Sequence, residues 1–120
     1  MKRVLLFLQA LGLTAALLGG CSEAELPQRN LQADDCLREV KLEQLDAALS
    51  RCDKVVAQYP NDPAPRNERS LLLALKGDDA AACRDIEAAH RLAQRPGKGK
   101  LDPMLVSELS MRHRSCQASR

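Results

Sequence analysis

Two prolines around an Asn-Asp pair mark the main boundary in this 120-residue chain. Neither Pro60 nor Pro63 suits the interior of a helix, because proline lacks a backbone N–H and its ring clashes with the preceding turn. On both sides of this boundary, apolar residues recur at intervals of three and four positions, and no stretch alternates as a half-buried strand does. The sequence therefore predicts an all-α fold.

Start and stop signals divide this pattern into helices. We expect helical structure from about Leu31 to Tyr59, with a turn near residues 42–44, and a second run over 64–76 that ends at Gly77. Asp78 or Asp79 can cap a third run that reaches about residue 94. A last helix is expected from Asp102 and Pro103 through about residue 113.

Two segments of the chain match at a fixed spacing of 34 residues. Ala48, Cys52 and Val55 correspond to residues 34 positions later, Ala82, Ile86 and Ala89. A period of 34 with paired helices resembles the tetratricopeptide repeat. The resemblance covers about residues 31–95, with 101–113 resembling a capping helix, although Leu73 stands where a tyrosine is common and Glu43 replaces a turn glycine. The alternative is an irregular bundle of the same helices.

The N-terminus has the pattern of an export signal. Lys2 and Arg3 precede an apolar run over 4–18, which as a helix would be roughly 22 Å long, shorter than the ~30 Å hydrocarbon core of a bilayer. The run ends in Leu18-Gly19-Gly20-Cys21, which resembles the bacterial lipobox. That resemblance implies removal of residues 1–20 and a thioether-linked lipid on Cys21, with a further acyl chain on its amine. An ordinary cleavable signal before a disulfide cysteine is the alternative.

The resemblance to bacterial lipoproteins also implies a location. Ser22, where retention in the inner membrane would call for aspartate, favours the outer membrane, with the domain in the periplasm. Residues 21–30 are polar and without period, which is typical of a flexible tether, and 31–120 form the expected helical domain.

The charge distribution argues against nucleic acid as a partner. Without Lys2 and Arg3, the 18 basic side chains become 16 and balance the 16 acidic ones. Residues 95–120 hold six basic and two acidic side chains, but Tyr59 is the only aromatic residue after the signal on which bases could stack. The basic tail therefore indicates solvated surface, or a patch that faces acidic partners or lipid headgroups.

With Cys21 assigned to lipid, four cysteines remain: Cys36, Cys52, Cys83 and Cys116. An even number in an oxidising compartment predicts two disulfides, for which three pairings are possible. The tetratricopeptide resemblance implies antiparallel helices on either side of residues 42–44, which would place Cys36 beside Cys52 and leave Cys83 for Cys116.

The sequence offers no convergent set of catalytic, cofactor-binding or metal-binding groups. The serines lack a glycine-framed nucleophile turn, and the glycines near residue 98 lack the preceding strand of a phosphate loop. His90 lies alone on a helical stretch, and Asp78-Asp79 suits a helix start. We therefore expect a protein that is not an enzyme and that needs no cofactor.

A binding role remains. In stacked helix pairs the first helix of each pair lines a groove that holds a peptide or a partner helix. The residues expected there, mostly apolar with a few polar ones, are Leu37, Val40, Lys41, Asn67, Leu71, Ala74, Leu105 and Glu108. Such a face suits an amphipathic helix of another envelope protein, although in so short an array the same leucines can instead close the core.

Two functions fit these expectations. The first is a lipid-anchored adaptor or scaffold for an envelope assembly, similar to pilotin lipoproteins in its anchor and its repeats. The second is an inhibitor or immunity lipoprotein that binds a toxin or a hydrolase in the periplasm. Size and disulfides suit both.

Overall fold

The computed structural model describes residues 30–97 and 99–120, and this part of the chain forms four α-helices and no strand. The elements are a short 3₁₀ helix, η1 (Leu42–Gln44), and the helices α1 (Leu45–Gln58), α2 (Pro63–Leu75), α3 (Asp79–Ala93) and α4 (Pro103–Ala118). The all-α prediction is confirmed. The expected signal peptide, Cys21 and the tether up to residue 29 lie outside the described residues.

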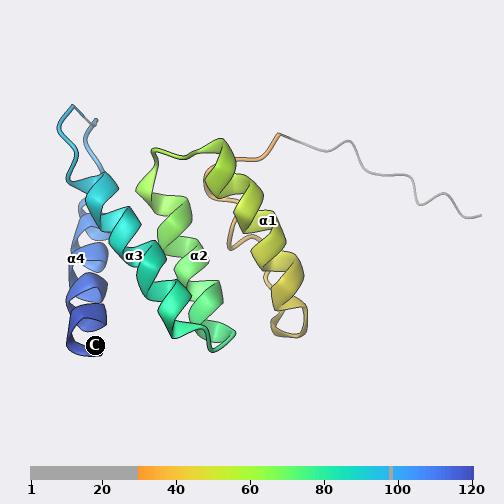
Figure 1. The fold of residues 1–120 in the computed structure, drawn as a ribbon. Helices are drawn as coiled ribbons and strands as arrows, with labels where there is room; N and C mark the ends of the chain where they lie inside the picture. Colours follow the sequence, from red (N-terminus) through yellow and green to blue (C-terminus); the bar gives the residue numbers. More distant parts are fainter. Residues whose placement is uncertain (1–29, 98) are drawn as a thin grey trace, which may run out of the picture.

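Helices that follow one another in the chain also lie next to one another in space (Figure 1). The ribbon alternates in direction from α1 to α4, so that α2 lies between α1 and α3, and α4 covers the other side of α3. The contact between α2 and α3 is the most extensive. The result is a small stacked array of antiparallel helices.

An aspartate caps each of the last three helices, because its carboxylate accepts a backbone N–H that has no partner inside the first turn. The three N-cap contacts are Asp62 to Ala64 N at 2.9 Å, Asp78 to Ala81 N at 3.0 Å, and Asp102 to Met104 N at 2.8 Å. Gly77 ends α2 with a φ of 85°, a left-handed conformation that favours glycine. The three starts and the stop at Gly77 confirm the boundaries expected at these positions.

The expectation of a helix before residue 42 is wrong. Residues 30–41 form turns and irregular structure, and Leu31, Cys36 and Val40 of this segment pack against α1 and α2. Glu39 has a φ of 50°, which no α-helix tolerates. Asp35 accepts the backbone N–H of Gln32 at 2.7 Å and the Nε of Arg38 at 2.9 Å, so local side-chain bonds replace the helical ladder.

The last helix is longer than expected. It continues to Ala118, five residues past His113, and its C-terminal part carries Cys116. Cys116 is buried and joined to Cys83 of α3, so that this covalent contact holds the final turns of α4 against the array.

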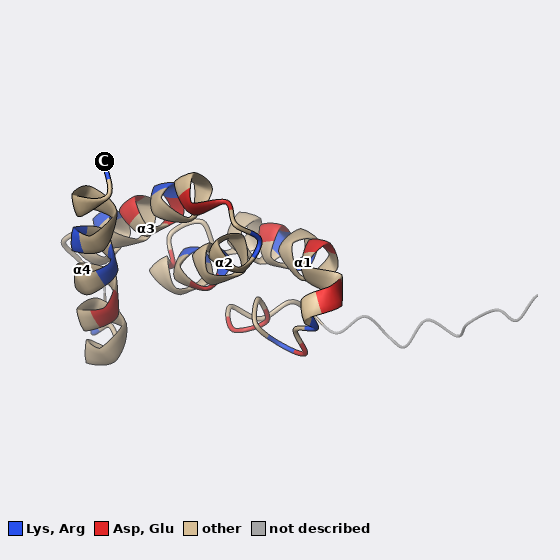
Figure 2. Ribbon diagram, turned by 90° about the horizontal axis from the view of Figure 1, so that it is seen from below, with Lys and Arg blue, Asp and Glu red and all other residues tan. Residues whose placement is uncertain are grey.

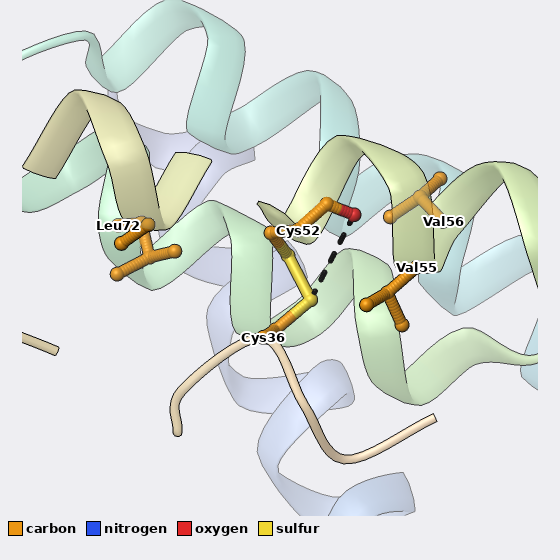
Figure 3. Close-up of a cluster of buried hydrophobic side chains, with 6 residues drawn as sticks. Cys36, Cys52, Val55, Val56 and Leu72 are labelled. Atoms are coloured by element: carbon orange, nitrogen blue, oxygen red, sulfur yellow. Dashed lines mark hydrogen bonds between the residues drawn. A yellow bond between two sulfur atoms is a disulfide. The ribbon is translucent and has the colours of Figure 1, made fainter. Parts of the chain in front are cut away.

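The first core cluster lies between the 30–41 loop, α1 and α2 (Figure 3). It consists of Cys36, Ala48, Cys52, Val55, Val56 and Leu72. The disulfide between Cys36 and Cys52 joins the loop to α1 at the centre of this cluster, with the Cys36 Sγ 3.9 Å from the carbonyl oxygen of Cys52. The pairing expected for Cys36 is confirmed, although it links a loop to a helix rather than two helices.

The second core cluster lies between α3 and α4 and contains Ile86, Ala89, Leu109 and Cys116. The disulfide between Cys83 and Cys116 closes it, which confirms the second pairing. The six residues related by the 34-residue spacing are all buried, three in α1 and three in α3. Corresponding positions of these two helices therefore both face the interior.

Candidate partner-binding groove

One face of α2 forms the floor of the candidate site. Asn67, Leu71 and Ala74 follow one another at spacings of four and three residues, which places them on one stripe of the helix. Asn67 is buried, Leu71 is half-buried and Ala74 is exposed, so the stripe opens to the surface toward the C-terminal end of α2.

The wall on one side is the 30–41 loop. The disulfide at Cys36 fixes its centre, and Arg51 of α1 donates hydrogen bonds to the backbone oxygens of Asp35 and Arg38. Tyr59 donates its hydroxyl to the carbonyl of Leu31 at 2.9 Å. Arg51 and Tyr59 thus satisfy three carbonyl groups that a helix would have paired internally, and these contacts hold the loop in a defined shape.

Between this wall and α2 lies an apolar groove of about 450 Å³. Six side chains line it: Leu37 and Val40 from the loop, and Leu71, Leu72, Ala74 and Leu75 from α2. Leu72 is fully buried, whereas Leu75 is 58% exposed and Leu37 is 41% exposed. The groove therefore combines a packed base with apolar rims that face water.

The surface on the opposite side of the stripe is polar, because Arg112 of α4 lies there. Its Nη1 donates to the side-chain oxygen of Asn67 at 2.6 Å and to the Asn67 carbonyl at 3.2 Å. The same nitrogen lies 3.6 Å from a carboxylate oxygen of Glu108. Asn67 thus positions Arg112, and the residues of α2 that line the groove all follow Asn67 in the chain.

The expected groove residues are only partly brought together. One groove is lined by four of them: Leu37, Val40, Leu71 and Ala74. Lys41, which follows Val40 in the chain, is exposed. Asn67 and Glu108 instead contact Arg112, and Leu105 packs on the second core cluster. The expectation of one face from Leu37 through Leu105 is therefore wrong, because α4 turns its leucines toward α3.

Sequence reasoning missed Leu72, Leu75 and the central place of Arg112. A signal for Arg112 exists, because the inward stripe of α4 reads Leu105, Leu109, Arg112 and Cys116 at helical spacing. A basic residue on an otherwise buried stripe indicates a specific polar contact.

Glu68 lies near the N-terminal end of the α2 surface. Burial raises the pKa of its carboxyl above the ordinary 4.5, and together with the smaller effects of the charges of Asp34, Asp62, Asp35 and Glu108 it brings the pKa to about 7. Its Oε2 atom is buried and has no hydrogen-bond partner in the described part of the chain. The N-terminal end of the α2 surface is therefore acidic, and its C-terminal end is apolar.

Two histidines meet between α3 and α4. The rings of His90 in α3 and His113 in α4 stack with centroids 4.2 Å apart. Burial, with a smaller effect from the charge of His113, lowers the pKa of His90. Among residues 30–97 and 99–120, no group of three or more His, Cys, Asp or Glu side chains is arranged to hold a metal ion.

In the part of the chain that the structure describes, no helix has both the length and the apolar character needed to cross a bilayer. Comparisons of the chain with protein-family models, with curated proteins and with solved structures find no match.

Proposed function

We propose that this protein is an outer-membrane lipoprotein whose periplasmic domain, a short tetratricopeptide-like array, acts as an adaptor for an envelope assembly. The lipid on Cys21 anchors the chain, and residues 22–30 carry the domain into the periplasm. The apolar groove between the 30–41 loop and α2 binds an amphipathic helix of the partner.

The observation that supports this proposal is the groove itself. Leu37, Val40, Leu71 and Leu75 form a concave apolar surface from two separate segments, yet about half of the surface of Leu37 and of Leu75 remains exposed. Leaving leucine side chains in water costs free energy, about 25 cal/mol per Å² of apolar surface, which a partner recovers by covering them. A helix that inserts residues at intervals of three and four positions fits such a groove.

Site-specific cross-linking in the living cell tests the adaptor function. A photo-reactive residue in place of Leu75 is expected to trap one envelope protein, whereas the same residue in place of Met104 on α4, which is 78% exposed, is expected to trap none. Adding Leu37→Glu to the Leu75 probe should abolish the product, because the charge would be buried without a partner on docking.

The identity of the trapped protein then separates the two candidate functions. A structural component of a secretion or pilus assembly supports the adaptor, and the purified pair should bind directly. A single hydrolase or toxin, inactive while bound, would instead indicate an inhibitor or immunity lipoprotein. Equal products from positions 75 and 104, or products that survive Leu37→Glu, would contradict binding in the groove.

A further inference from the structure

Arg112 stands at the edge of the partner surface with unused hydrogen-bonding capacity. A guanidinium carries five N–H donors on three nitrogens. Only Nη1 has partners among the described residues, namely the two oxygens of Asn67 and, more distantly, Glu108. Nε and Nη2 make no hydrogen bond there, so donors remain for a ligand from outside the chain.

The charge of Arg112 is also poorly compensated. Burial lowers the pKa of the guanidinium, and the opposing effect of Glu108 is the smaller one. Arginine nevertheless keeps its proton in proteins, so the side chain is a cation that has lost part of its hydration. A carboxylate placed against its free edge would form charge-assisted and bidentate hydrogen bonds.

Space for such a group exists beside the apolar groove. A second pocket, of about 300 Å³, is lined by Arg112, Ser115 and Ser119 of α4 and by the start of α3. Ala74 lines both this pocket and the apolar groove, so the two are neighbours that meet at this small side chain of α2. A helix in the groove can therefore reach the pocket with a residue on its flank.

The surrounding charges determine where a carboxylate fits. Glu68 and Glu108 would repel it at the N-terminal end of α2, whereas the pocket near Ala74 has Asp79 as its acidic lining residue. Asp79 is exposed in the first turn of α3, where the positive end of the helix dipole offsets its charge. The C-terminal part of the chain is basic, and blue segments recur along α4 in Figure 2.

We propose that the partner helix carries an aspartate or glutamate beside its apolar residues, and that this carboxylate pairs with the free edge of Arg112 in the pocket near Ala74. This inference rests on the proposed groove function and specifies the chemistry of the partner. The apolar residues of the partner supply the contact area, and the carboxylate fixes the register and the direction of the bound helix.

The test selects ligands without knowledge of the natural partner. The oxidised full chain, as the cell processes it, is purified in lipid nanodiscs and used to select from a displayed library of amphipathic helices of about 18 residues, or five turns. Ligands that no longer bind Leu75→Glu are retained. We expect them to share one acidic position on the flank of the apolar stripe.

Matched peptides then assign the acidic position to Arg112. Changing the acid of the ligand to its amide is expected to weaken binding to the wild-type chain about tenfold, and to leave binding to Arg112→Gln unchanged. Arg112→Lys should retain part of the preference for the acid over the amide. Asp79→Asn should strengthen this preference, because it removes a like charge from the pocket. Arg114→Gln, which removes an exposed charge elsewhere on α4, is the control and should bind as the wild type does.

Each outcome separates this inference from the groove function. Ligands that bind the groove without an acidic position, or a preference that persists in Arg112→Gln, would overturn the inference and leave the groove intact. Failure to select any ligand sensitive to Leu75→Glu would overturn both. Melting temperatures of all variants identify any loss of binding that comes from unfolding.

Discussion

Arg69 of α2 holds Asp85 of α3 with two hydrogen bonds of 2.7 Å, one from Nε and one from Nη2. The third nitrogen, Nη1, reaches Asp53 of α1 at 2.9 Å, so one side chain connects three helices. Asp85 is buried, and its hydrogen bond raises the pKa of Arg69. The ion pair thus joins the two core clusters through the helix that lies between them.

Loss of this arginine should destabilise the whole array. Arg69→Met removes both close hydrogen bonds of the buried Asp85 and leaves it only Arg66, at 3.6 Å. We expect a decrease of about 3 kcal/mol in the free energy of unfolding, measured by urea denaturation. Lys76→Met is the control, because it removes an exposed pair with Asp46 and should cost less than about 1 kcal/mol. Equal effects of the two substitutions would contradict a structural role for the buried pair.

The second disulfide should govern the docking of α4. Cys83 and Cys116 are 33 residues apart. Because their link restricts the unfolded chain, it stabilises the folded state by roughly 3–4 kcal/mol. In the double variant Cys83→Ala/Cys116→Ala, hydrogen exchange of α4 amides should accelerate more than that of α2 amides. The matching variant of Cys36 and Cys52 should loosen the 30–41 loop and leave α4 protected. If hydrogen exchange accelerated equally in all helices of both variants, the two disulfides would not stabilise separate parts of the array.

Glu68 should make the protein less stable at higher pH. Its pKa in the folded state, about 7, is above the ordinary 4.5, so its contribution to stability is complete below pH 4.5 and is lost as the pH rises through 7. The loss is on the order of 2 kcal/mol, allowing for screening by solvent. Glu68→Gln should remove this slope in urea midpoints between about pH 5 and pH 8, whereas the exposed control Glu43→Gln should retain it.

His90 should make the protein less stable at lower pH, the opposite of the effect of Glu68. Because its folded pKa lies below the ordinary 6.5, its contribution to stability is present above pH 6.5 and is lost as the pH falls through the folded value. In the Glu68→Gln background, stability should therefore decline on acidification below about pH 6.5, and His90→Asn should reduce that decline. A decline that is the same with and without the imidazole would rule out the stacked pair as its source.

Lipidation is tested at Cys21. Cys21→Ser should leave unprocessed precursor and abolish labelling by a fatty-acid probe, because serine provides no thiol for the thioether bond. Ser22→Ala is the control for processing and should still be labelled. Normal labelling of Cys21→Ser would contradict the lipoprotein assignment and, with it, the location of the adaptor.

The helices after residue 60 could be predicted because their boundaries depend on local chemistry. Asp62, Asp78 and Asp102 cap helices through contacts two or three residues away, and the left-handed Gly77 needs no tertiary partner. The cysteine pairs were also predicted, but only as what the resemblance to the tetratricopeptide repeat implies, and the helix that this resemblance implied around Cys36 is a loop.

The 30–41 loop could not be predicted from periodicity alone. Leu37 and Val40 have helical spacing, but contacts from distant residues determine the conformation: the bond to Cys52, the Arg51 hydrogen bonds and the Tyr59 hydroxyl. Such tertiary contacts override a weak local preference. The same limit applies to Glu68, whose raised pKa depends first on its burial and then on charges brought from three separate segments.

The cross-link at Cys36 also has a mechanical consequence. A membrane anchor N-terminal to residue 30 would pull on the chain through Leu31 and then Cys36, before the tension could reach Leu37 and Val40. Because Cys36 is bonded to Cys52, the load passes directly into α1 and bypasses the intervening loop. Leu37 and Val40, the two loop side chains that line the groove, would thus be shielded from a force on such an anchor, whatever its distance from the domain.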